Sequence, residues 1–343
     1  MENTNESVSM INMFTYPVFC VRNGIITEAN HYAQQRMIRV GTIINDLMED
    51  CLLEYADFSG CCISLTLHVE GAAIPTVVTR LNDTDVFHMF NENENTEIRA
   101  MALVAQAINE PLNELVNLKK SEKHNPDFQK SLHKLQRITS NISAANMYIH
   151  GRPYGMQLGN ITSKLDEILR EAKKLAKASK RKLVFTNQTN ALYCPFDWDI
   201  LEKAIFNLIS NAIKGSPEQS TIKVTVTASD GRLRLSIQNT DNGLGNNNDL
   251  FTRYMRAPQI EDGRHGVGLG IPIAQLAAST HNGTLLLDRP DGETIRFTLS
   301  ISTKMQDGDI LRSPSLQIDH LGGFKSSLVE LADVLPSIAY NDL

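Results

Sequence analysis

Four short motifs, which follow one another between residues 207 and 270, limit the possible folds of this chain more than any other feature. The first is NLISNAIK, residues 207–214, in a stretch with the pattern of a helix. Asn207 and Asn211 are four residues apart and share a helix face, which Lys214 extends. An amide oxygen is a hard ligand that suits Mg²⁺, and a lysine can place its charge near phosphate. Two asparagines alone are most often solvated surface, so the other three motifs give this one its weight.

The second motif is DNGLG, residues 241–245, which comes directly after a predicted strand. The Asp241 carboxylate can accept a hydrogen bond from the amino-bearing edge of a base. Gly243 and Gly245 allow the backbone to approach a ligand closely. The structural alternative is an ordinary turn that begins at an aspartate.

The third and fourth motifs add cations and more glycines. LFTRYMR, residues 250–256, combines aromatic and basic side chains, among them Arg253. GVGLG opens a predicted helix, and the N–H groups and positive dipole end of a helix start favour phosphate. Its glycines are Gly266, Gly268 and Gly270. The motif lacks the Lys-Ser/Thr ending of a P-loop, which excludes that class of site.

Strands and helices alternate around these motifs and predict an α/β sandwich. Ser163 can cap a helix with apolar residues from Leu165 to Ala176, and Asp197 can cap another that runs to about Ile213. A further helix is expected over residues 270–280. Strands are expected over residues 182–186, 222–228, 233–239, 283–288 and 294–301.

Together the four motifs resemble, in order and spacing, the ATP-binding domain of bacterial sensor histidine kinases. Its superfamily, the GHKL ATPases with the Bergerat fold, includes the gyrase, heat-shock chaperone and mismatch-repair ATPases. The resemblance covers residues 157–303 and implies ATP and Mg²⁺ as ligands. It implies that Asn211 holds the metal and that Asp241 binds the adenine amino group. The remaining implied positions are Asn207, Lys214 and Arg253 at the phosphates, Gly243 and Gly245 at the adenine pocket, and Gly266, Gly268 and Gly270 at the end of the lid.

Two amphipathic stretches precede this region, in residues 96–152. The first repeats Ile98, Ala105 and Leu112 every seven residues, and the second carries Phe128 and Leu135 at the same spacing. A short polar segment joins them, which predicts an antiparallel helical hairpin. Two hairpins would bury both stripes in a four-helix bundle, so we expect a homodimer through residues 96–152. The alternative is a hairpin that packs against its own chain.

The hairpin resembles the dimerisation and phosphotransfer domain of the same kinases. In that family a phospho-accepting histidine, followed by an acidic residue, stands five residues before a proline. Pro111 is present here, but Gln106 and Ala107 occupy the other two positions. A glutamine amide is not basic and cannot carry a phosphoryl group, so this domain is expected to be degenerate. Glu110 replaces the Thr or Asn that the family links to phosphatase activity. The histidines that could substitute are His124, His133 and His150, whereas His265 and His281 are expected to be structural.

Residues 1–92 and 304–343 flank these regions. Asn23-Gly24 is a strong hairpin signal between strands 18–22 and 25–29. A helical stretch and strands near 63–69, 75–80 and 86–90 follow, and this order resembles a PAS sensor domain. In the tail, a weak amphipathic helix with Phe324, Leu328, Leu331 and Leu335 could dock on a neighbour. The chain is therefore expected to be an α+β multidomain protein.

The composition excludes several classes of protein. The formal net charge of −6 argues against a nucleic-acid binder, which would carry a basic stripe. Five cysteines without a CxxC pair fit a reducing compartment. The sequence shows no signal-peptide pattern and no apolar run of the roughly 18 residues that a membrane span needs. We therefore expect a cytoplasmic protein.

Three functional hypotheses follow. In the first, the chain binds Mg-ATP and acts as a degenerate kinase that switches a partner kinase or a response regulator. In the second, it is an active sensor histidine kinase that autophosphorylates on a non-standard residue. The third, a serine kinase of the anti-sigma type, shares the ATP domain but usually lacks the long hairpin. The sequence does not decide between a chain with autokinase activity and one without it.

Overall fold

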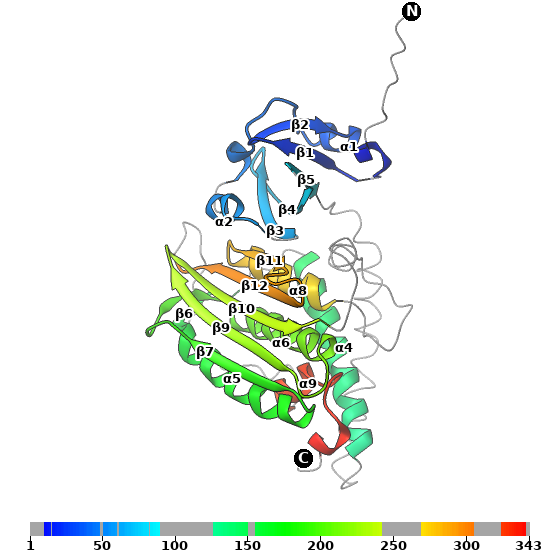
Figure 1. Ribbon diagram of the computed structural model, residues 1–343, viewed down its shortest axis with the longest axis vertical. Coiled ribbons are helices and arrows are strands. Elements are labelled where there is room, and N and C mark those ends of the chain that lie inside the picture. Colours follow the sequence, from blue (N-terminus) through cyan, green and yellow to red (C-terminus); the bar gives the residue numbers. More distant parts are fainter. Residues whose placement is uncertain are drawn as a thin grey trace, which may run out of the picture.

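The computed structural model describes residues 10–14, 16–48, 51–59, 62–81, 83–89, 126–149, 155–241, 269–304 and 324–340. The expected first helix of the hairpin, with Gln106, lies outside the described residues. So do Arg253 and the glycines from Gly243 to Gly268. Figure 1 shows the N-terminal strands at one end of the molecule and α5 with the C-terminal segment toward the other.

Ten strands form one sheet in the order β2-β1-β5-β4-β3-β11-β12-β10-β9-β7. All neighbours are antiparallel except β7 and β9, which are parallel. The strands are β1 (Val18–Arg22), β2 (Ile25–Ala29), β3 (Cys62–Val69), β4 (Ala72–Leu81), β5 (Thr84–Met89), β7 (Lys182–Asn187), β9 (Thr221–Ser229), β10 (Arg232–Thr240), β11 (Thr284–Asp288) and β12 (Thr294–Ser302). The sequence predicted each of these strands to within a few residues, and the mixed α+β class with a large sheet is observed.

Turn residues explain the local accuracy of these predictions. Asn23 and Gly24 both have positive φ, 50° and 76°, which is the backbone that a tight hairpin turn requires. Asp230 and Gly231 repeat the arrangement between β9 and β10, with φ of 54° and 73°. In the N-terminal part, α1 (His31–Gln35), η2 (Ile44–Leu47) and α2 (Leu52–Ala56) follow β2. The 3-10 helix η1 (Met10–Met13) precedes β1.

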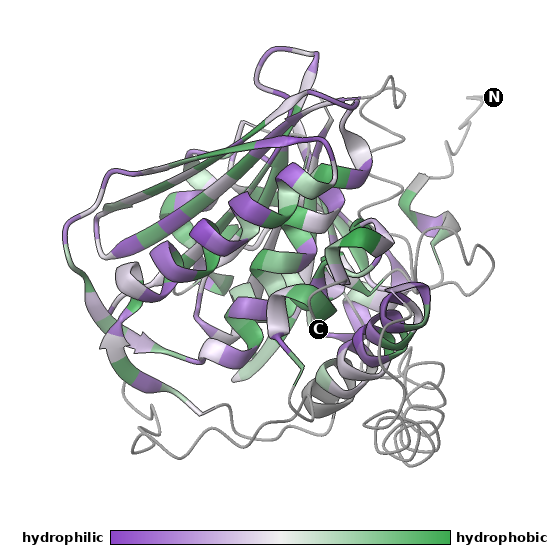
Figure 2. Cartoon of the chain, turned by 90° about the horizontal axis from the view of Figure 1, so that it is seen from below, coloured by the Kyte–Doolittle hydropathy of each residue, from purple (hydrophilic) through white to green (hydrophobic). Residues whose placement is uncertain are grey.

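Three helices cover one face of the C-terminal half of the sheet: α5 (Ile161–Ala178), α6 (Trp198–Gly215) and α8 (Gly270–Thr280). Their apolar sides face the sheet and their polar sides face outward (Figure 2). The cap of α5 differs from the prediction, because the side chain of Asn160 accepts the hydrogen bond from the Ser163 N–H. Asp197 caps α6 as predicted.

The sequence analysis missed a small second sheet. β6 (Gln157–Asn160) and β8 (Tyr193–Phe196) pair in antiparallel fashion in front of α5 and α6. Each strand has only four residues, which is too short for alternation of apolar and polar side chains to be visible in the sequence.

The N-terminal and C-terminal strands meet at β3 and β11. Leu285 pairs with Ser64, and Leu286 with Ile63, so the sheet continues from one region into the other. A buried ion pair supports this junction, with 2.9 Å between Arg232 Nε and a carboxylate oxygen of Glu54 from α2. The sequence analysis treated residues 1–92 and 157–303 as separate domains, and unpaired strand edges explain how the two can join.

The C-terminal segment folds back on its own chain. It contains the short helix α9 (Ser326–Glu330) and the 3-10 helix η5 (Ser337–Tyr340). Leu328, Leu331 and Leu335 are buried in the same apolar core as α5 and α6. The predicted apolar face exists, and it packs against the chain's own helices. The helix that carries it is only five residues long.

The long helix α4 (Pro126–Ile149) corresponds to the expected second helix of the hairpin. It packs against its own chain, with Leu132, His133 and Arg137 buried. Phe128 and Leu135 of the predicted stripe are 42% and 41% exposed. The two faces of α4 thus differ, since one contacts its own chain and the other carries the exposed side chains of Phe128 and Leu135.

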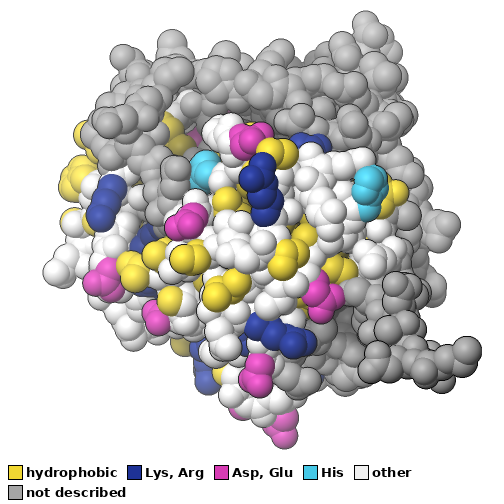
Figure 3. All heavy atoms as spheres, turned by 90° about the horizontal axis from the view of Figure 1, so that it is seen from above, with side chains coloured by type: hydrophobic (Ala, Val, Ile, Leu, Met, Phe, Trp, Pro, Cys, Tyr) yellow, Lys and Arg dark blue, Asp and Glu magenta, His cyan; other side chains and the backbone are white. Residues whose placement is uncertain are grey.

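Exposed large apolar side chains are frequent in the N-terminal region, where Tyr32, Met37 and Val40 are examples. Figure 3 shows this end of the molecule with apolar side chains spread among polar and charged ones. Of the helices that the structure describes, none is both long and apolar enough to cross a bilayer.

Replacement of the α6 cap tests whether this local signal stabilises the fold. The Asp197 carboxylate accepts hydrogen bonds from the N–H groups of Asp199, Ile200 and Gly155 at 3.1, 3.4 and 2.9 Å. Asp197→Ala should lower the free energy of unfolding by about 1–2 kcal/mol because these donors lose their acceptor. Urea unfolding followed by the fluorescence of Trp198, the single tryptophan, measures the change. Asp199→Ala, which removes an exposed charge from the same turn, is the control and should have little effect. Equal stability of both variants would contradict the role of the cap.

Candidate functional site

Described residues of the first and fourth motifs meet where α6 and α8 pack together, and β10 lies beside them. Gly270, the first residue of α8, lies against Asn207, and a Cβ at position 270 would be 3.2 Å from Asn207 Oδ1. At the end of α6, a Cβ at Gly215 would be 3.4 Å from the side chain of Asn239 on β10. Glycine at these positions allows the three elements to approach one another. The structure therefore brings the first and fourth motifs together and places β10, which leads into the second motif, beside the end of α6.

Asn207 is fully engaged with its surroundings. Its side chain is 1% exposed, and Nδ2 donates to the carbonyl oxygen of Lys203 at 3.0 Å. Oδ1 accepts a hydrogen bond from Arg137 Nη2 at 2.9 Å. The amide predicted to face phosphate is thus held by an arginine of α4. Asn211, one turn further along α6, is half-buried.

Lys214 also has a partner within the chain. Its Nζ donates to a carboxylate oxygen of Asp333 at 2.9 Å. Burial lowers the pKa of Lys214, and the negative charge of Asp333 opposes that shift. Burial alone would raise the pKa of Asp333, but the charges of Arg137 and Lys214 outweigh it and hold this pKa below its usual value. Asp333 is therefore an anion at neutral pH.

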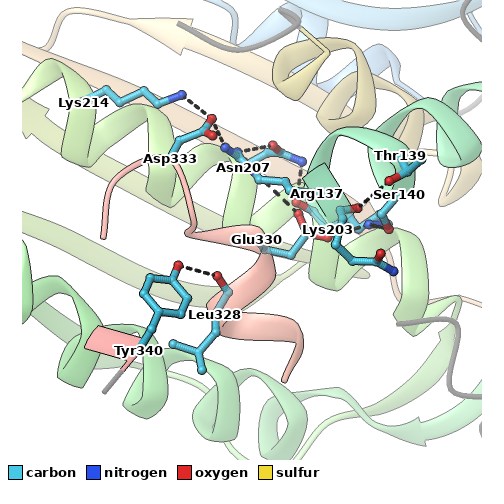
Figure 4. A network of polar contacts seen from close by, with 11 residues as sticks. Arg137, Thr139, Ser140, Lys203, Asn207, Lys214, Leu328, Glu330, Asp333 and Tyr340 are labelled. Carbon is cyan, nitrogen blue, oxygen red and sulfur yellow. Dashed lines mark hydrogen bonds and ion pairs between the residues drawn. The ribbon is translucent and has the colours of Figure 1, made fainter. Parts of the chain in front are cut away.

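Figure 4 shows how these groups form one network between α4, α6 and the C-terminal segment. Arg137 pairs with Asp333 and reaches Asn207. Lys203 binds Glu330, with 2.5 Å between Nζ and Oε1, and contacts Ser140 of α4. The carboxylate of Glu330 is 1% exposed. The network is buried at Arg137 and Glu330, is partly exposed at Lys214 and Asp333, and joins cations from two helices to two acids from the C-terminal segment.

Sequence reasoning missed this network. Arg137 lies on the polar side of a helix that the sequence marks by its apolar stripe. Glu330 and Asp333 lie in a tail that has no sequence link to the four motifs. The only signal in the sequence is that the two acids stand three residues apart between the leucines of an amphipathic segment.

Asp241, at the end of β10, is held on both sides. Its N–H donates to the carbonyl oxygen of Glu293 at 2.9 Å. Its carboxylate accepts a hydrogen bond from Arg289 Nη2 at 2.5 Å, and the side chain is only 4% exposed. The carboxylate predicted to bind adenine thus lies next to an arginine from the loop between β11 and β12.

His133 and His281 are buried and make contacts within the chain. His281 accepts a hydrogen bond from the Asp197 N–H through Nε2 at 2.9 Å, so its Nδ1 carries the proton and donates to the Ala277 carbonyl oxygen. His133 is 1% exposed, lies edge-on against the ring of Phe324 and packs at a tilt against the ring of Tyr340. A buried ring of this kind is not accessible to a phosphate donor. His124, His150 and His265 lie outside the described residues.

The binding of Mg²⁺ at this site would require a bound nucleotide. Over the part of the chain that the structure describes, no group of three or more His, Cys, Asp or Glu side chains could hold a metal. A single amide oxygen, such as that of Asn211, suits Mg²⁺ when phosphate oxygens and water complete the shell. The half-buried position of Asn211 on α6 fits this arrangement.

Comparison with known proteins supports the identity of this region. Residues 196–303 match the family model of the histidine kinase-, DNA gyrase B-, and HSP90-like ATPases. The chain is 34% identical over 110 residues to the sensor-like histidine kinase SenX3 of Mycolicibacterium smegmatis, which is 31% of this chain and 28% of that protein. It is 30% identical over 123 residues to the sensor histidine kinase WalK of Bacillus subtilis, covering 34% of this chain and 20% of that protein.

Among solved structures, full-length ShkA in complex with AMPPNP is similar, with a TM-score of 0.45 and 17% identity over 61% of this chain and 47% of that one. The matched stretches span less than a third of the length of SenX3 and WalK. Residues 196–303, hereafter the ATPase domain, thus match the histidine kinase-, DNA gyrase B-, and HSP90-like ATPases, and the chain is similar to sensor histidine kinases over about a third of its length.

The stability of the fold is expected to depend on pH through Glu202, which lies where α6 meets the C-terminal segment. Burial raises the pKa of Glu202 to about 7, and Glu330 and Asp199 add to this shift, while Ser326 and Lys203 oppose it. The pKa of Glu202 is higher in the folded chain than in the unfolded chain. Its protonated carboxyl therefore contributes stability that is complete below the unfolded-state pKa and is lost as the pH rises through the folded-state pKa of about 7. The wild type should therefore lose about 1–2 kcal/mol more stability than Glu202→Gln between pH 5.5 and 8.5.

Urea unfolding at the two pH values, followed by Trp198 fluorescence, provides the measurement. Glu167→Gln, an exposed position on α5, is the matched control and should behave like the wild type. If the Glu202 variant and the wild type lose the same stability, the protonated carboxyl is not part of the folded state.

Proposed function

We propose that this chain is a histidine-kinase-like signalling protein whose ATPase domain binds Mg-ATP. The observation that carries the proposal is the family match at residues 196–303, in which Asn207 of α6 and Gly270 of α8 lie against each other. In this proposal Asn211 binds Mg²⁺ and Asp241 binds the adenine amino group. Lys214 and Asn207 face the phosphates.

The proposal extends to a degenerate kinase. Gln106 stands where the related kinases carry the accepting histidine, and its amide cannot attack a phosphoryl group. The burial of His133 argues against that residue as a substitute. The chain would then use nucleotide binding to change its conformation, which requires that the ligand bind two states with different affinity.

Partners follow from the same reasoning. A protein that binds ATP without accepting phosphate acts through what it contacts, namely a partner kinase or a response regulator. The exposed side chains of Phe128 and Leu135, seven residues apart on α4, support a homodimer through residues 96–152. The N-terminal region would act as the PAS-like sensor.

Removal of the proposed magnesium ligand tests the nucleotide site. Asn211→Ala should weaken the binding of Mg-ATP about tenfold, because it deletes a polar partner worth about 1–3 kcal/mol. Titration calorimetry measures the affinity. Asn187→Ala, on the edge strand β7, controls for the loss of an amide and should bind like the wild type. Unchanged affinity in the Asn211 variant would remove this residue from the site.

Incubation with γ-labelled ATP separates the degenerate kinase from an active one. We expect the purified chain to acquire no label that is labile in acid and stable in base, since Gln106 stands at the acceptor position and His133 is buried. A related active histidine kinase, treated in parallel, shows that the assay works. Label of that kind on this chain would establish the autokinase alternative and end the proposal of a degenerate kinase.

A further inference from the structure

An acidic side chain lies at the phosphate end of the proposed nucleotide site. Asp333 places one carboxylate oxygen 2.9 Å from Lys214 Nζ, and the same oxygen binds a guanidinium nitrogen of Arg137. Arg137 also binds Asn207 of the first motif. The anion therefore sits between two cations and beside an asparagine that the proposed function assigns to phosphate (Figure 4).

The chemistry of this contact is that of a phosphate site. Arginine and lysine bind carboxylate and phosphate oxygens through the same charge-assisted hydrogen bonds. Asp333 keeps its negative charge because the two cations hold its pKa down against the effect of burial. Lys214 and Arg137 lie on different helices, α6 and α4, so the point between them is a site shaped by the fold rather than a local turn.

The segment that carries Asp333 is anchored on both sides of this residue. Before it, Glu330 binds Lys203, and Ser327 donates to a carboxylate oxygen of Glu171 at 2.7 Å. After it, the carbonyl oxygen of Val334 accepts a hydrogen bond from the Ser179 hydroxyl at 2.7 Å. The Tyr340 hydroxyl donates to the Leu328 carbonyl oxygen at 3.1 Å and closes the segment on itself. Buried leucines hold this structure against α5 and α6.

We propose that residues 324–340 are an internal ligand of the nucleotide site. In this inference Asp333 occupies the position between Lys214 and Arg137 that a phosphate group of a nucleoside triphosphate would take. The nucleotide and the segment then compete for the same cations, and Arg137 becomes a phosphate-binding residue when the segment leaves. The inference rests on the proposed binding of Mg-ATP and adds how that binding is controlled.

Competition of this kind has two consequences. The measured affinity for nucleotide equals the intrinsic affinity multiplied by the fraction of molecules whose segment has left the site. The coupling is reciprocal, so bound nucleotide must also weaken the docking of the segment. Because Phe324 and Tyr340 pack against His133 of α4, release of the segment would loosen the contact between α4 and the ATPase domain.

The test is the affinity for Mg-AMPPNP, a non-hydrolysable nucleotide, measured by titration calorimetry on the full chain. Asp333→Asn keeps the shape of the side chain but removes its charge, and it should bind about tenfold more tightly than the wild type. Glu218→Gln removes one negative charge from an exposed ion pair with Lys180 and should leave the affinity unchanged. Melting curves of both variants show that the fold is retained.

Hydrogen exchange on the wild type gives a second measurement that needs no variant. Saturating Mg-AMPPNP should speed the exchange of the backbone amides from Leu328 to Leu335. If Asp333→Asn binds no more tightly than the wild type and these amides stay protected with nucleotide bound, the inference is wrong while the proposed function stands. If neither chain binds nucleotide, the proposed function fails, and this inference fails with it.

Discussion

The carboxylate of Asp333, shared between Arg137 and Lys214, is the contact that joins three distant parts of this chain. A buried ion pair adds little net stability by itself, because removing both charges from water costs about as much as their attraction returns. The docking of the segment therefore depends on its leucines, each worth about 1.5–3 kcal/mol when fully buried. The charges determine where the segment sits, since loss of one partner would leave a buried charge unpaired.

The same principle explains why the proposed nucleotide site is occupied by the protein's own side chains. Asp241 is held by Arg289 at the base end, and Asn207 and Lys214 are held by Arg137 and Asp333 at the phosphate end. A buried polar group without a partner is costly, so a site that binds a charged ligand needs internal partners when that ligand is absent. Such partners make the empty state stable and turn ligand binding into an exchange of contacts.

An exchange of contacts can be transmitted because the elements around the site are connected. The sheet runs from β3 into β11, and the buried pair of Glu54 and Arg232 bridges this junction. A change of conformation in the N-terminal strands would therefore act on β10 and β12, which lie beside the site. Under the proposed function, a signal that enters at the N-terminal strands or through α4 reaches the ATPase domain.

The sequence by itself determined the helices and the main-sheet strands of the ATPase region, but not the short strands β6 and β8, and it supplied the candidate motif residues. These features are local: the Asn-Gly and Asp-Gly turns, the Asp197 cap and the apolar periodicities act within a few residues of one another. The tertiary structure alone decided what the motif residues contact. Arg137 and Asp333 are 196 residues apart, and the pairing of β3 with β11 joins strands more than 200 residues apart, so no local pattern could predict them. The polar side chains of α4 and the acids of the C-terminal segment form their contacts only when folding brings the partners within hydrogen-bond distance.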